Sequence, residues 1–375
     1  MGPLAGRTDS VSGTRLICCN HYMRPKPTRG RGPSAGRIDM DLKLLDQTLA
    51  DRGEPRFRSR QVWAWAARGV GGYEQMTDLP VSLRDALARE LPFSSLVVQS
   101  EARAHDGTVK ALFATADDRP LEAVMMSYRD GRRSLCLSSQ SGCPLTCTFC
   151  ATGRMRFARN LTASEIVDQA LHFRRVSGAI THCVFMGMGE PMLNLENVLA
   201  ACERLPDLGI THRRTTISTV GWIPGIEALS EHDRPLRLAL SVHAADEALR
   251  SELMPVNDRF PLADVIEAAR AFYARKHRRV FVEYVMLAGV NDRYAQALAL
   301  ARALSAPSAG EPSIFKVNLI PYNPTGSPFQ GSTRQSIAAF AAALQSRGIP
   351  TTVRLTRGRE IDAACGQLAA RSAAM

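Results

Sequence analysis

The sequence lacks long apolar runs and is poor in acidic residues relative to basic ones. No segment approaches the roughly 18 consecutive apolar residues that a membrane-spanning helix needs. The N-terminal region carries charge without an apolar core stretch, so a secretory signal is not expected either. We therefore expect a cytoplasmic protein without a membrane partner. The composition, 45% hydrophobic and 22% charged over 375 residues, fits one large α/β domain and a small accessory one.

The shortage of acidic residues, 36 against 47 lysines and arginines, leaves a net charge of +11. Such a charge suggests a polyanionic partner such as nucleic acid. Residues 1–39 hold seven of the basic groups and two aspartates, so nearly half of the excess lies in a segment rich in Gly, Pro, Arg and Ser. This segment has no apolar periodicity and is predicted to be a disordered N-terminal extension. Charge alone is therefore a weak indication of RNA.

The chain beyond this extension begins with two small predicted parts. Residues 40–95 form a helical accessory domain, with helical patterns at Asp41–Arg52, Phe57–Arg68 and Ser82–Leu91. Residues 96–130 alternate apolar and polar positions in three stretches, which predicts an antiparallel β meander that links this domain to the core.

Residues 131–375 form the predicted core, in which strand-like and helix-like segments alternate. The clearest helix is Ala163–Val176, which begins with a capping box of Thr162 and Glu165. Strict β/α alternation implies a parallel sheet, and six such units predict an α/β fold, a partial (β/α)6 barrel with its site at the carboxyl ends of the strands. The predicted strands are Ser134–Ser139, Ile180–Met186, Thr215–Thr219, Leu236–Val242, Val280–Met286, Phe315–Ile320 and Thr351–Leu355.

Nine cysteines in such a chain indicate metal or redox chemistry rather than a disulfide framework. Cys143, Cys147 and Cys150 form a C-x3-C-x2-C triplet in the loop after the first core strand. Three thiolates can hold three irons of a [4Fe–4S] cubane and leave the fourth iron open, where the amino and carboxylate groups of S-adenosylmethionine can chelate it. A zinc site is the alternative, although zinc favours C-x2-C pairs and no second pair is present.

The other cysteines outside the extension fall into two kinds. Cys183 and Cys202 lie in apolar strand-like and helix-like segments, so we interpret them as small buried hydrophobic residues. Cys136 lies on the strand that enters the cluster loop, and Cys365 lies after the last strand among small residues that suit a mobile, approachable loop. Two buried thiols remain the alternative for this second pair.

The cluster triplet and its surroundings resemble a known family. C-x3-C-x-aromatic-C is the signature of the radical S-adenosylmethionine superfamily, and Phe149 occupies the aromatic position. The flanking segments narrow the resemblance to the RlmN/Cfr family of RNA methyltransferases, and the likeness covers residues 41–370. The segments that carry it are Leu137–Gln140, Ala151–Gly153, Arg159–Leu161 and Ile361–Leu368.

A glycine-rich turn, Phe185–Pro191, ends a buried strand and supplies Glu190, whose carboxylate can accept the methionyl ammonium of S-adenosylmethionine. Alone, such a turn could be ordinary strand punctuation, and a lone His243 would more often be structural. The family resemblance implies that the S-adenosylmethionine site is lined by Gly189, Glu190, Ser218, Ser241, Val242, His243 and Asn323.

The resemblance also implies a two-step chemistry that uses two molecules of S-adenosylmethionine. Cys365 first takes a methyl group as a thiolate, and a 5′-deoxyadenosyl radical from the second molecule then activates that S-methyl group. The resulting carbon radical adds to an adenine ring carbon, Glu122 removes the ring proton, and Cys136 attacks the Cys365 sulfur to release the product and a transient disulfide. The spacing between Glu122 and Cys136 is one residue longer than in relatives, and an exposed strand glutamate is the alternative.

Family members methylate C2 or C8 of an adenosine. The C2 enzymes act on 23S rRNA and often on an adenosine beside the tRNA anticodon, whereas the C8 enzymes confer antibiotic resistance. C8 enzymes carry Ala after the Gly-Glu pair and Arg before Tyr-Asn-Pro, but Pro191 and Pro321 occupy those positions, so C2 is predicted. A noncatalytic iron–sulfur RNA-binding protein and a radical enzyme that activates a protein partner are the other candidates, and neither requires both Cys136 and Cys365.

The expected partners follow from this chemistry. They are 23S rRNA and tRNA, a low-potential electron donor of the flavodoxin or ferredoxin type, and a thiol reductant for the disulfide; a monomer is expected. RNA must be unstacked to expose a ring carbon, and basic residues near the site could hold its phosphates. The candidate basic segments are Arg154–Arg159, Arg213–Arg214, Lys276–Arg279 and Arg354 with Arg357 and Arg359.

Overall fold

The computed structural model describes residues 1–2, 42–305 and 313–370 of the chain. The predicted N-terminal extension, residues 1–39, therefore lies outside the described part except for its first two residues. No helix in the described ranges is long and apolar enough to cross a membrane.

The first described elements are helices α1 (Leu42–Asp51), α2 (Phe57–Arg68) and α3 (Val81–Glu90), with the short 3-10 helix η1 (Tyr73–Gln75) before α3. They form close to the predicted positions because apolar residues at helical spacing give each of them one buried face. The buried faces meet in a small apolar cluster of their own, made by Leu45, Leu49, Val62, Tyr73, Met76, Leu79, Leu83, Leu87 and Leu91.

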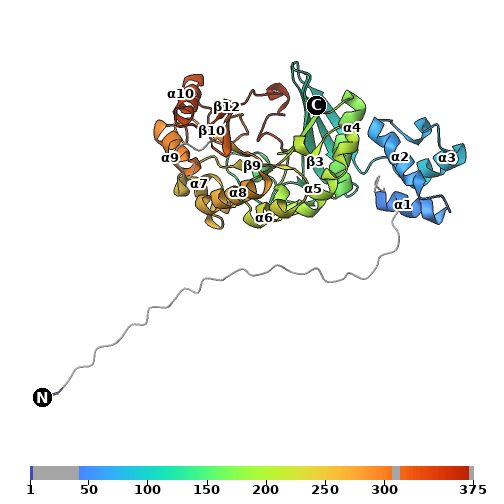
Figure 1. Ribbon diagram of the computed structural model, residues 1–375, viewed down its shortest axis with the longest axis horizontal. Coiled ribbons are helices and arrows are strands. Elements are labelled where there is room, and N and C mark those ends of the chain that lie inside the picture. The colour runs from blue at the N-terminus through green and yellow to red at the C-terminus, as the bar shows by residue number, and fades with distance from the viewer. Residues whose placement is uncertain (3–41, 306–312, 371–375) are drawn as a thin grey trace. The chain divides into compact units, whose positions relative to one another are not determined.

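A continuous sheet of ten strands follows, in the order β1-β2-β3-β4-β7-β8-β9-β10-β11-β12 (Figure 1). The first three strands form the predicted antiparallel meander, and β3 pairs antiparallel with β4. From β4 onward every pair is parallel, as predicted for a partial barrel. The strands are β1 (Val97–Arg103), β2 (Val109–Ala114), β3 (Pro120–Ser127), β4 (Arg133–Leu137), β7 (His182–Phe185), β8 (Thr215–Thr219), β9 (Arg237–Ser241), β10 (Val280–Met286), β11 (Phe315–Pro321) and β12 (Thr351–Val353).

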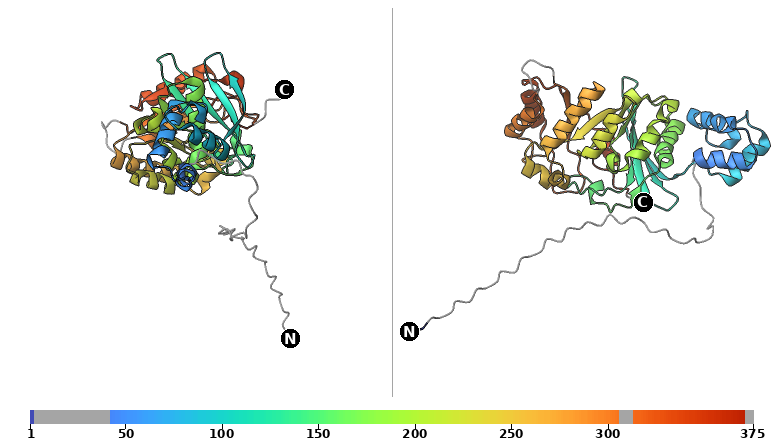
Figure 2. Two further views of the ribbon diagram at one scale, coloured as in Figure 1. Left: turned by 90° about the vertical axis from the view of Figure 1, so that its right-hand side faces the viewer. Right: turned by 60° about the horizontal axis from the view of Figure 1, so that its bottom comes forward.

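Helices lie on the outer side of the parallel strands, as Figures 1 and 2 show. The capping box predicted for α4 is confirmed: the Thr162 hydroxyl accepts from the Glu165 backbone N–H at 3.2 Å, and the Glu165 carboxylate accepts from the Thr162 N–H at 2.8 Å. The helices are α4 (Ala163–Ser177), α5 (Leu195–Cys202), α6 (Ile223–Glu231), α7 (Glu247–Leu253), α8 (Leu262–Lys276), α9 (Tyr294–Leu304) and α10 (Arg334–Gln345).

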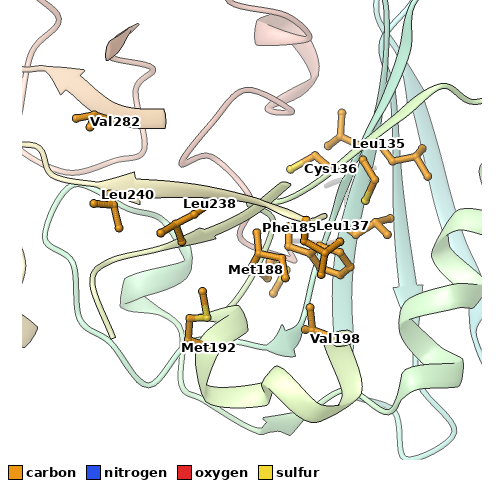
Figure 3. Packing of buried hydrophobic residues seen from close by; sticks show 14 of the residues in the cluster. Leu135, Cys136, Leu137, Phe185, Met188, Met192, Val198, Leu238, Leu240 and Val282 are labelled. Atoms are coloured by element: carbon orange, nitrogen blue, oxygen red, sulfur yellow. The ribbon is translucent and has the colours of Figure 1, made fainter. Parts of the chain in front are cut away.

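The strand–helix alternation places the functional loops together. Carboxyl ends of parallel strands meet at one edge of a sheet, so the loop after β4, the turn after β7 and the ends of β8 to β11 converge there. Buried apolar side chains fix this edge from below; Figure 3 shows Leu135, Cys136 and Leu137 of β4 beside Phe185 and Met188. Cys183 and Cys202 are 2% and 0% exposed in the same core, which confirms that both are buried residues.

Candidate functional site

The strand ends and the segment after β12 enclose a cavity with an empty volume of about 1550 Å³, counting the part that is open to solvent. Val242 and Glu122 do not line it, but the other predicted site residues do. Those that line it are Cys136, Cys143, Cys147, Cys150, Gly189, Glu190, Ser218, Ser241, His243, Asn323 and Cys365.

The cluster loop is held in place by its backbone. Gly142, just before the first cysteine, has a φ of +75°, and a Cβ there would lie 2.3 Å from the Arg156 carbonyl oxygen, so only glycine fits. The Thr148 N–H donates to the Leu253 carbonyl at the end of α7 at 3.0 Å, and the Ala151 N–H donates to the Gly366 carbonyl at 2.8 Å. The loop is therefore tied both to α7 and to the segment that carries Cys365.

The three thiols of this loop face one space that disfavours free thiolates. Burial raises the pKa of Cys143 to about 12 and the pKa of Cys147 well above its ordinary value, and the neighbouring Cys150 and Glu190 raise both further. A bound metal group compensates such thiolates, and a cubane takes each one on a separate iron. The arrangement fits a [4Fe–4S] cluster. Across the described residues, no three or more His, Cys, Asp and Glu side chains form a set for a single metal ion.

Glu190 is a buried carboxylate, 2% exposed, at the end of the glycine-rich turn. It accepts from the backbone N–H groups of Met192 at 3.1 Å and Val220 at 3.0 Å. Gly189 has a φ of +94° and packs against Gln140, which brings the turn close to the cavity. Burial raises the pKa of Glu190 to about 7, and no cation among the described residues forms an ion pair with it. The carboxylate is thus suited to bind a ligand's ammonium group.

His243 follows the carboxyl end of β9 and Asn323 follows that of β11, and both contribute polar atoms to the cavity. The His243 Nδ1 accepts from the Val285 backbone N–H at 3.0 Å, so its proton lies on Nε2. Burial lowers the pKa of His243 to about 3, which keeps the ring neutral, and the ring packs against Phe149 at 4.7 Å between centroids. The Asn323 Nδ2 donates to the Cys365 carbonyl at 3.4 Å, while its buried Oδ1 has no partner. An unsatisfied buried oxygen in the lining points to a ligand that donates a hydrogen bond.

Cys136 and Cys365 are free thiols that line the same cavity. Cys136 is 8% exposed on β4, and burial raises its pKa to about 12, with a further contribution from the Cys365 thiol. Cys365 faces the open cavity as an exposed residue, which confirms that it is approachable. Desolvation by the surrounding protein atoms raises the pKa of Cys365, and the positive charge of Arg354 partly offsets that rise.

Arg354 is held above these thiols by an ion pair with Glu283 at 3.2 Å. Glu283 is 3% exposed on β10 and also accepts from Asn318 at 2.8 Å. Both partners line the cavity. The charge of Glu283 raises the pKa of Arg354, so the guanidinium stays protonated beside Cys136 and Cys365. Sequence reasoning proposed Arg354 only as a phosphate contact and missed Glu283, because a single glutamate in an apolar strand gives no signal.

Glu122 lies beneath the segment that carries Cys365. It is 2% exposed, which shows that the alternative of an exposed strand glutamate is wrong. Its carboxylate pairs with Lys110 at 2.9 Å and accepts from the backbone N–H groups of Ala369 at 2.9 Å and Ala370 at 3.0 Å. Burial arises because the chain after Cys365 folds back over β3, a contact that sequence spacing does not indicate.

Among the predicted basic segments, the one after β12 reaches the cavity, where Arg354 and Arg357 form part of the lining. Residues of the other segments are absent from the lining. Arg159 instead pairs with Asp117 at 2.6 Å and Glu165 at 2.7 Å, and so holds the start of α4. A buried residue that sequence reasoning missed is Arg250 on α7, 0% exposed, whose guanidinium donates to the Val220 carbonyl at 2.7 Å and to the Asn257 side chain.

Family models match two parts of the chain. Residues 137–301 match the radical SAM superfamily, and residues 38–91 match the N-terminal domain of a ribosomal RNA large subunit methyltransferase. The first match contains the cluster loop and the glycine-rich turn, and the second contains helices α1 to α3.

Whole-length relatives cover nearly all of the chain. A probable dual-specificity RNA methyltransferase RlmN from Thermus thermophilus is 45% identical over 337 residues, which cover 88% of this chain and 92% of the relative. The protein of the same name from Chloroflexus aurantiacus is 46% identical, with coverage of 89% and 92%. A crystal structure of a radical SAM methyltransferase from Sphaerobacter thermophilus superposes with a TM-score of 0.82 at 43% identity, and covers 89% of this chain and 98% of that one.

Proposed function

The chain belongs to the RlmN family of radical S-adenosylmethionine RNA methyltransferases, and on that premise we propose that it methylates C2 of an adenosine in 23S rRNA and of an adenosine beside the tRNA anticodon. Its cofactors are a [4Fe–4S] cluster and S-adenosylmethionine. The observation that carries the proposal is the meeting of five cysteines in one cavity, three in the cluster loop and two outside it. A noncatalytic RNA-binding protein would need only the first three.

The cofactors are held by one side of this cavity. Cys143, Cys147 and Cys150 hold the cluster, and the carboxylate of Glu190 binds the ammonium group of S-adenosylmethionine. Ser218, Ser241, His243 and Asn323 supply further polar contacts, and Val242 shapes the strand end from behind the lining. When bound, the cluster and S-adenosylmethionine supply one-electron chemistry that yields a 5′-deoxyadenosyl radical.

Cys365 carries the methyl group. Its thiolate attacks the methyl carbon of one S-adenosylmethionine. The sulfur lone pair forms the new C–S bond, the sulfonium C–S bond breaks, and S-adenosylhomocysteine leaves with that electron pair. Arg354 supports this step because its fixed positive charge stabilises the thiolate. The S-methyl group gives a hydrogen atom to the 5′-deoxyadenosyl radical, and its carbon bonds to the adenine ring carbon, so the RNA is transiently joined to the protein through Cys365. The addition leaves one unpaired electron on the ring, and the cluster, when bound, would accept it.

Glu122 and Cys136 complete turnover. Glu122 takes the ring proton. Its carboxylate first leaves Lys110 and the backbone N–H groups of the chain after Cys365, and then contacts the substrate. Cys136 then attacks the Cys365 sulfur; a disulfide forms, the bond between that sulfur and the methylene carbon breaks, and its electron pair passes to the product. A thiol reductant restores both cysteines, and a low-potential flavodoxin or ferredoxin type donor supplies the electron for the cluster.

C2 is favoured over C8 because Pro191 follows Glu190 and Pro321 ends β11, and both line the cavity. Anaerobic reaction of the reconstituted enzyme with 23S rRNA fragments and with tRNA, followed by nucleoside mass spectrometry, should give 2-methyladenosine. Appearance of 8-methyladenosine would assign the C8 activity, and product from rRNA alone would remove tRNA as a substrate.

The most direct test of the mechanism is Cys136→Ala. This variant should methylate Cys365 and add to RNA but fail to release it, and so accumulate a nuclease-sensitive RNA–protein band on a denaturing gel. Normal turnover, or a methylated Cys365 without any adduct, would show that another group resolves the intermediate. Cys365→Ala is the matched control, because it should keep the cluster and form neither product nor adduct.

A further inference from the structure

Tyr128 lies at the edge of the cavity with two arginines on its ring. It closes the β3–β4 hairpin, where its N–H donates to the Arg132 carbonyl at 2.8 Å. The Arg132 guanidinium carbon lies 4.1 Å from the ring centroid, and that of Arg357, from the segment after β12, lies 5.1 Å from it. Tyr128 and Arg357 both line the cavity. We refer to Arg132, Tyr128 and Arg357 as the Tyr128 stack.

Other rings of the lining are already engaged. Phe149 packs against His243, Phe185 is 1% exposed, and Tyr322 is 5% exposed with its hydroxyl bonded to Thr325 and Ser327. Tyr128 is only half-buried, and its hydroxyl makes a weak contact of 3.8 Å to the Met126 sulfur. Two arginines already lie over the Tyr128 ring, and the planar group of the stack that solvent reaches best is the Arg132 guanidinium, whose side chain is 44% exposed.

The surroundings of the stack are positively charged and partly apolar. Arg129, Arg133, Arg354 and Arg359 flank it in the sequence, and Leu355, 76% exposed, lines the cavity nearby. Arg132 meets its nearest carboxylate, Asp130, at 3.9 Å between two exposed side chains, and Arg357 meets Asp106 at 3.7 Å. The exposed pair of Arg132 is weak and exchanges readily for a phosphate, whereas the Arg357 side chain is 16% exposed and also donates to the Asp106 carbonyl at 3.3 Å.

We propose that the Tyr128 stack is an RNA-binding platform that holds the base next to the reacting adenosine. This proposal rests on RNA methylation as the proposed function. An adenosine whose ring carbon reaches Cys365 has left its stack, and its neighbour loses stacking as well. Aromatic and guanidinium planes both replace base stacking, and the arginines neutralise the adjacent phosphates.

The position of the stack relative to the two thiols identifies a neighbouring base rather than the reacting one. Arg132 precedes Cys136 by four residues, about 13 Å of extended chain, so the stack lies at the start of β4 and Cys136 lies further along it. A base on the stack is therefore assigned as a neighbour of the adenosine that reaches Cys365. Because Arg357 lies on the segment that carries Cys365, the stack fixes the position of the bound RNA relative to Cys365.

The test measures RNA affinity of the anaerobic, cluster-loaded enzyme. The probe is a fluorescent RNA hairpin that carries the target adenosine, with 2-aminopurine on either side of it in parallel experiments. Tyr128→Leu should weaken binding about tenfold, the effect of losing one base–aromatic stack, and should leave the flanking 2-aminopurine brighter. Tyr128→Phe, which keeps the ring, should restore most of the affinity.

Tyr294→Leu is the matched control. Tyr294 is 61% exposed on α9 and has the Arg347 guanidinium 5.9 Å from its ring centroid, but it does not line the cavity. Its loss should leave RNA affinity unchanged. Arg132→Ala and Arg357→Ala should each lower the slope of log affinity against log salt by about one.

Two further readouts separate the possible failures. Iron content and S-methylation of Cys365, neither of which involves RNA, report whether each variant is folded. If the wild-type enzyme binds RNA and Tyr128→Leu binds it equally well, the platform is refuted while the proposed function stands. If the folded wild-type enzyme binds no RNA, both are refuted. Weak binding by Tyr128→Leu with rescue by Tyr128→Phe supports the platform.

Discussion

The two sides of the cavity treat buried charge in opposite ways. The cofactor wall consists of the cluster loop, the turn that bears Glu190 and helix α7 behind them. On this wall Glu190 and Arg250 are buried at 2% and 0% exposure, and neither forms an ion pair among the described residues. Burial raises the pKa of Glu190 to about 7 and lowers that of Arg250 to about 10, which shows that each charge is held at a cost.

The carrier wall consists of residues 354–370 and the meander strands β2 and β3 beneath them. Here Glu122 pairs with Lys110 at 2.9 Å, and Glu283 pairs with Arg354 at 3.2 Å. Each carboxylate also accepts further hydrogen bonds from the protein. The carrier wall therefore balances its own charges.

The difference indicates which wall needs the charge of a ligand. A buried charge without a counter-charge is unfavourable, so a cationic ligand beside Glu190 would be stabilising, whereas Glu247 and the Cys147 thiol already offset part of the cost of burying Arg250. Arg250 lowers the pKa of Cys147, which places it within electrostatic reach of the cluster loop. The carrier wall requires no ligand to be stable, and this lets it hold Cys365 in place before and after the cofactors bind.

The largest expected effect is loss of the cofactor wall's iron. Cys147→Ala should reduce the iron content of anaerobically reconstituted protein from about four per chain to near zero and abolish cleavage of S-adenosylmethionine. Because the backbone bonds between this segment and the cluster loop do not involve the Cys365 side chain, Cys365→Ala should keep full iron and lose only RNA methylation. Zinc at full occupancy without iron uptake, or RNA methylation by Cys365→Ala, would contradict this division.

A second test removes the buried cation of the cofactor wall. Arg250→Met should lower the free energy of unfolding of the apoprotein by about 2–3 kcal/mol, because the Val220 and Phe260 carbonyls and the Asn257 side chain lose their donor. The midpoint potential of the loaded cluster should also fall. The positive charge of Arg250 stabilises the reduced cluster, and the variant lacks that charge. Arg250→Lys keeps a positive charge, so the midpoint potential of its cluster should stay close to that of the wild-type enzyme. Denaturant titration and potentiometric titration are the measurements, and equal potentials in both variants would contradict the electrostatic role.

A third test loosens the carrier wall alone. Glu122→Ala should increase hydrogen exchange of backbone amides in residues 363–370 and lower the free energy of unfolding by about 1–3 kcal/mol, because two amides and Lys110 lose their acceptor. Iron content should not change. Glu101→Ala is the control, since the Glu101 side chain pairs with Arg103 and with His172, each at 3.0 Å, and forms no ion pair with the described residues of the carrier wall. Unaltered exchange in Glu122→Ala would show that the segment is held by its other contacts.

The smallest effect is expected at thiols outside both walls. Cys183→Ala should lower the free energy of unfolding by about 1 kcal/mol through a small cavity, and leave iron content and RNA methylation unchanged. Iron analysis and nucleoside mass spectrometry check this. Loss of iron in Cys183→Ala would mean that the cofactor wall extends into the core beneath it.

The elements that follow from local pattern could be predicted from the sequence. Strands β8 and β10 form over the predicted Thr215–Thr219 and Val280–Met286, because short runs rich in β-branched residues fit a largely buried strand. The cysteine triplet was equally readable, since its three ligands lie within one loop. Cys136 and Cys365 were identified through family motifs rather than through chain geometry.

Residues whose roles depend on distant packing could not be predicted. Arg250 lies on a short helix with mixed charges and would be taken for a solvated residue, but it is fully buried because α7 packs against the cluster loop and the residues after β8. Glu122 gains the backbone N–H groups of Ala369 and Ala370, and Tyr128 gains Arg357, only when the chain after β12 folds back across the meander. No local spacing records such contacts.

The hydrogen bond from the Thr152 hydroxyl to the Leu368 carbonyl joins residues 216 positions apart, which bears on the order of biosynthesis. Translation delivers Cys143, Cys147 and Cys150 together with strands β4 to β11 well before Cys365. A chain that has not yet reached Leu368 lacks this bond. Under the proposed function, a chain that has not yet reached Cys365 cannot attach RNA to itself, because it lacks the residue proposed to carry the methyl group.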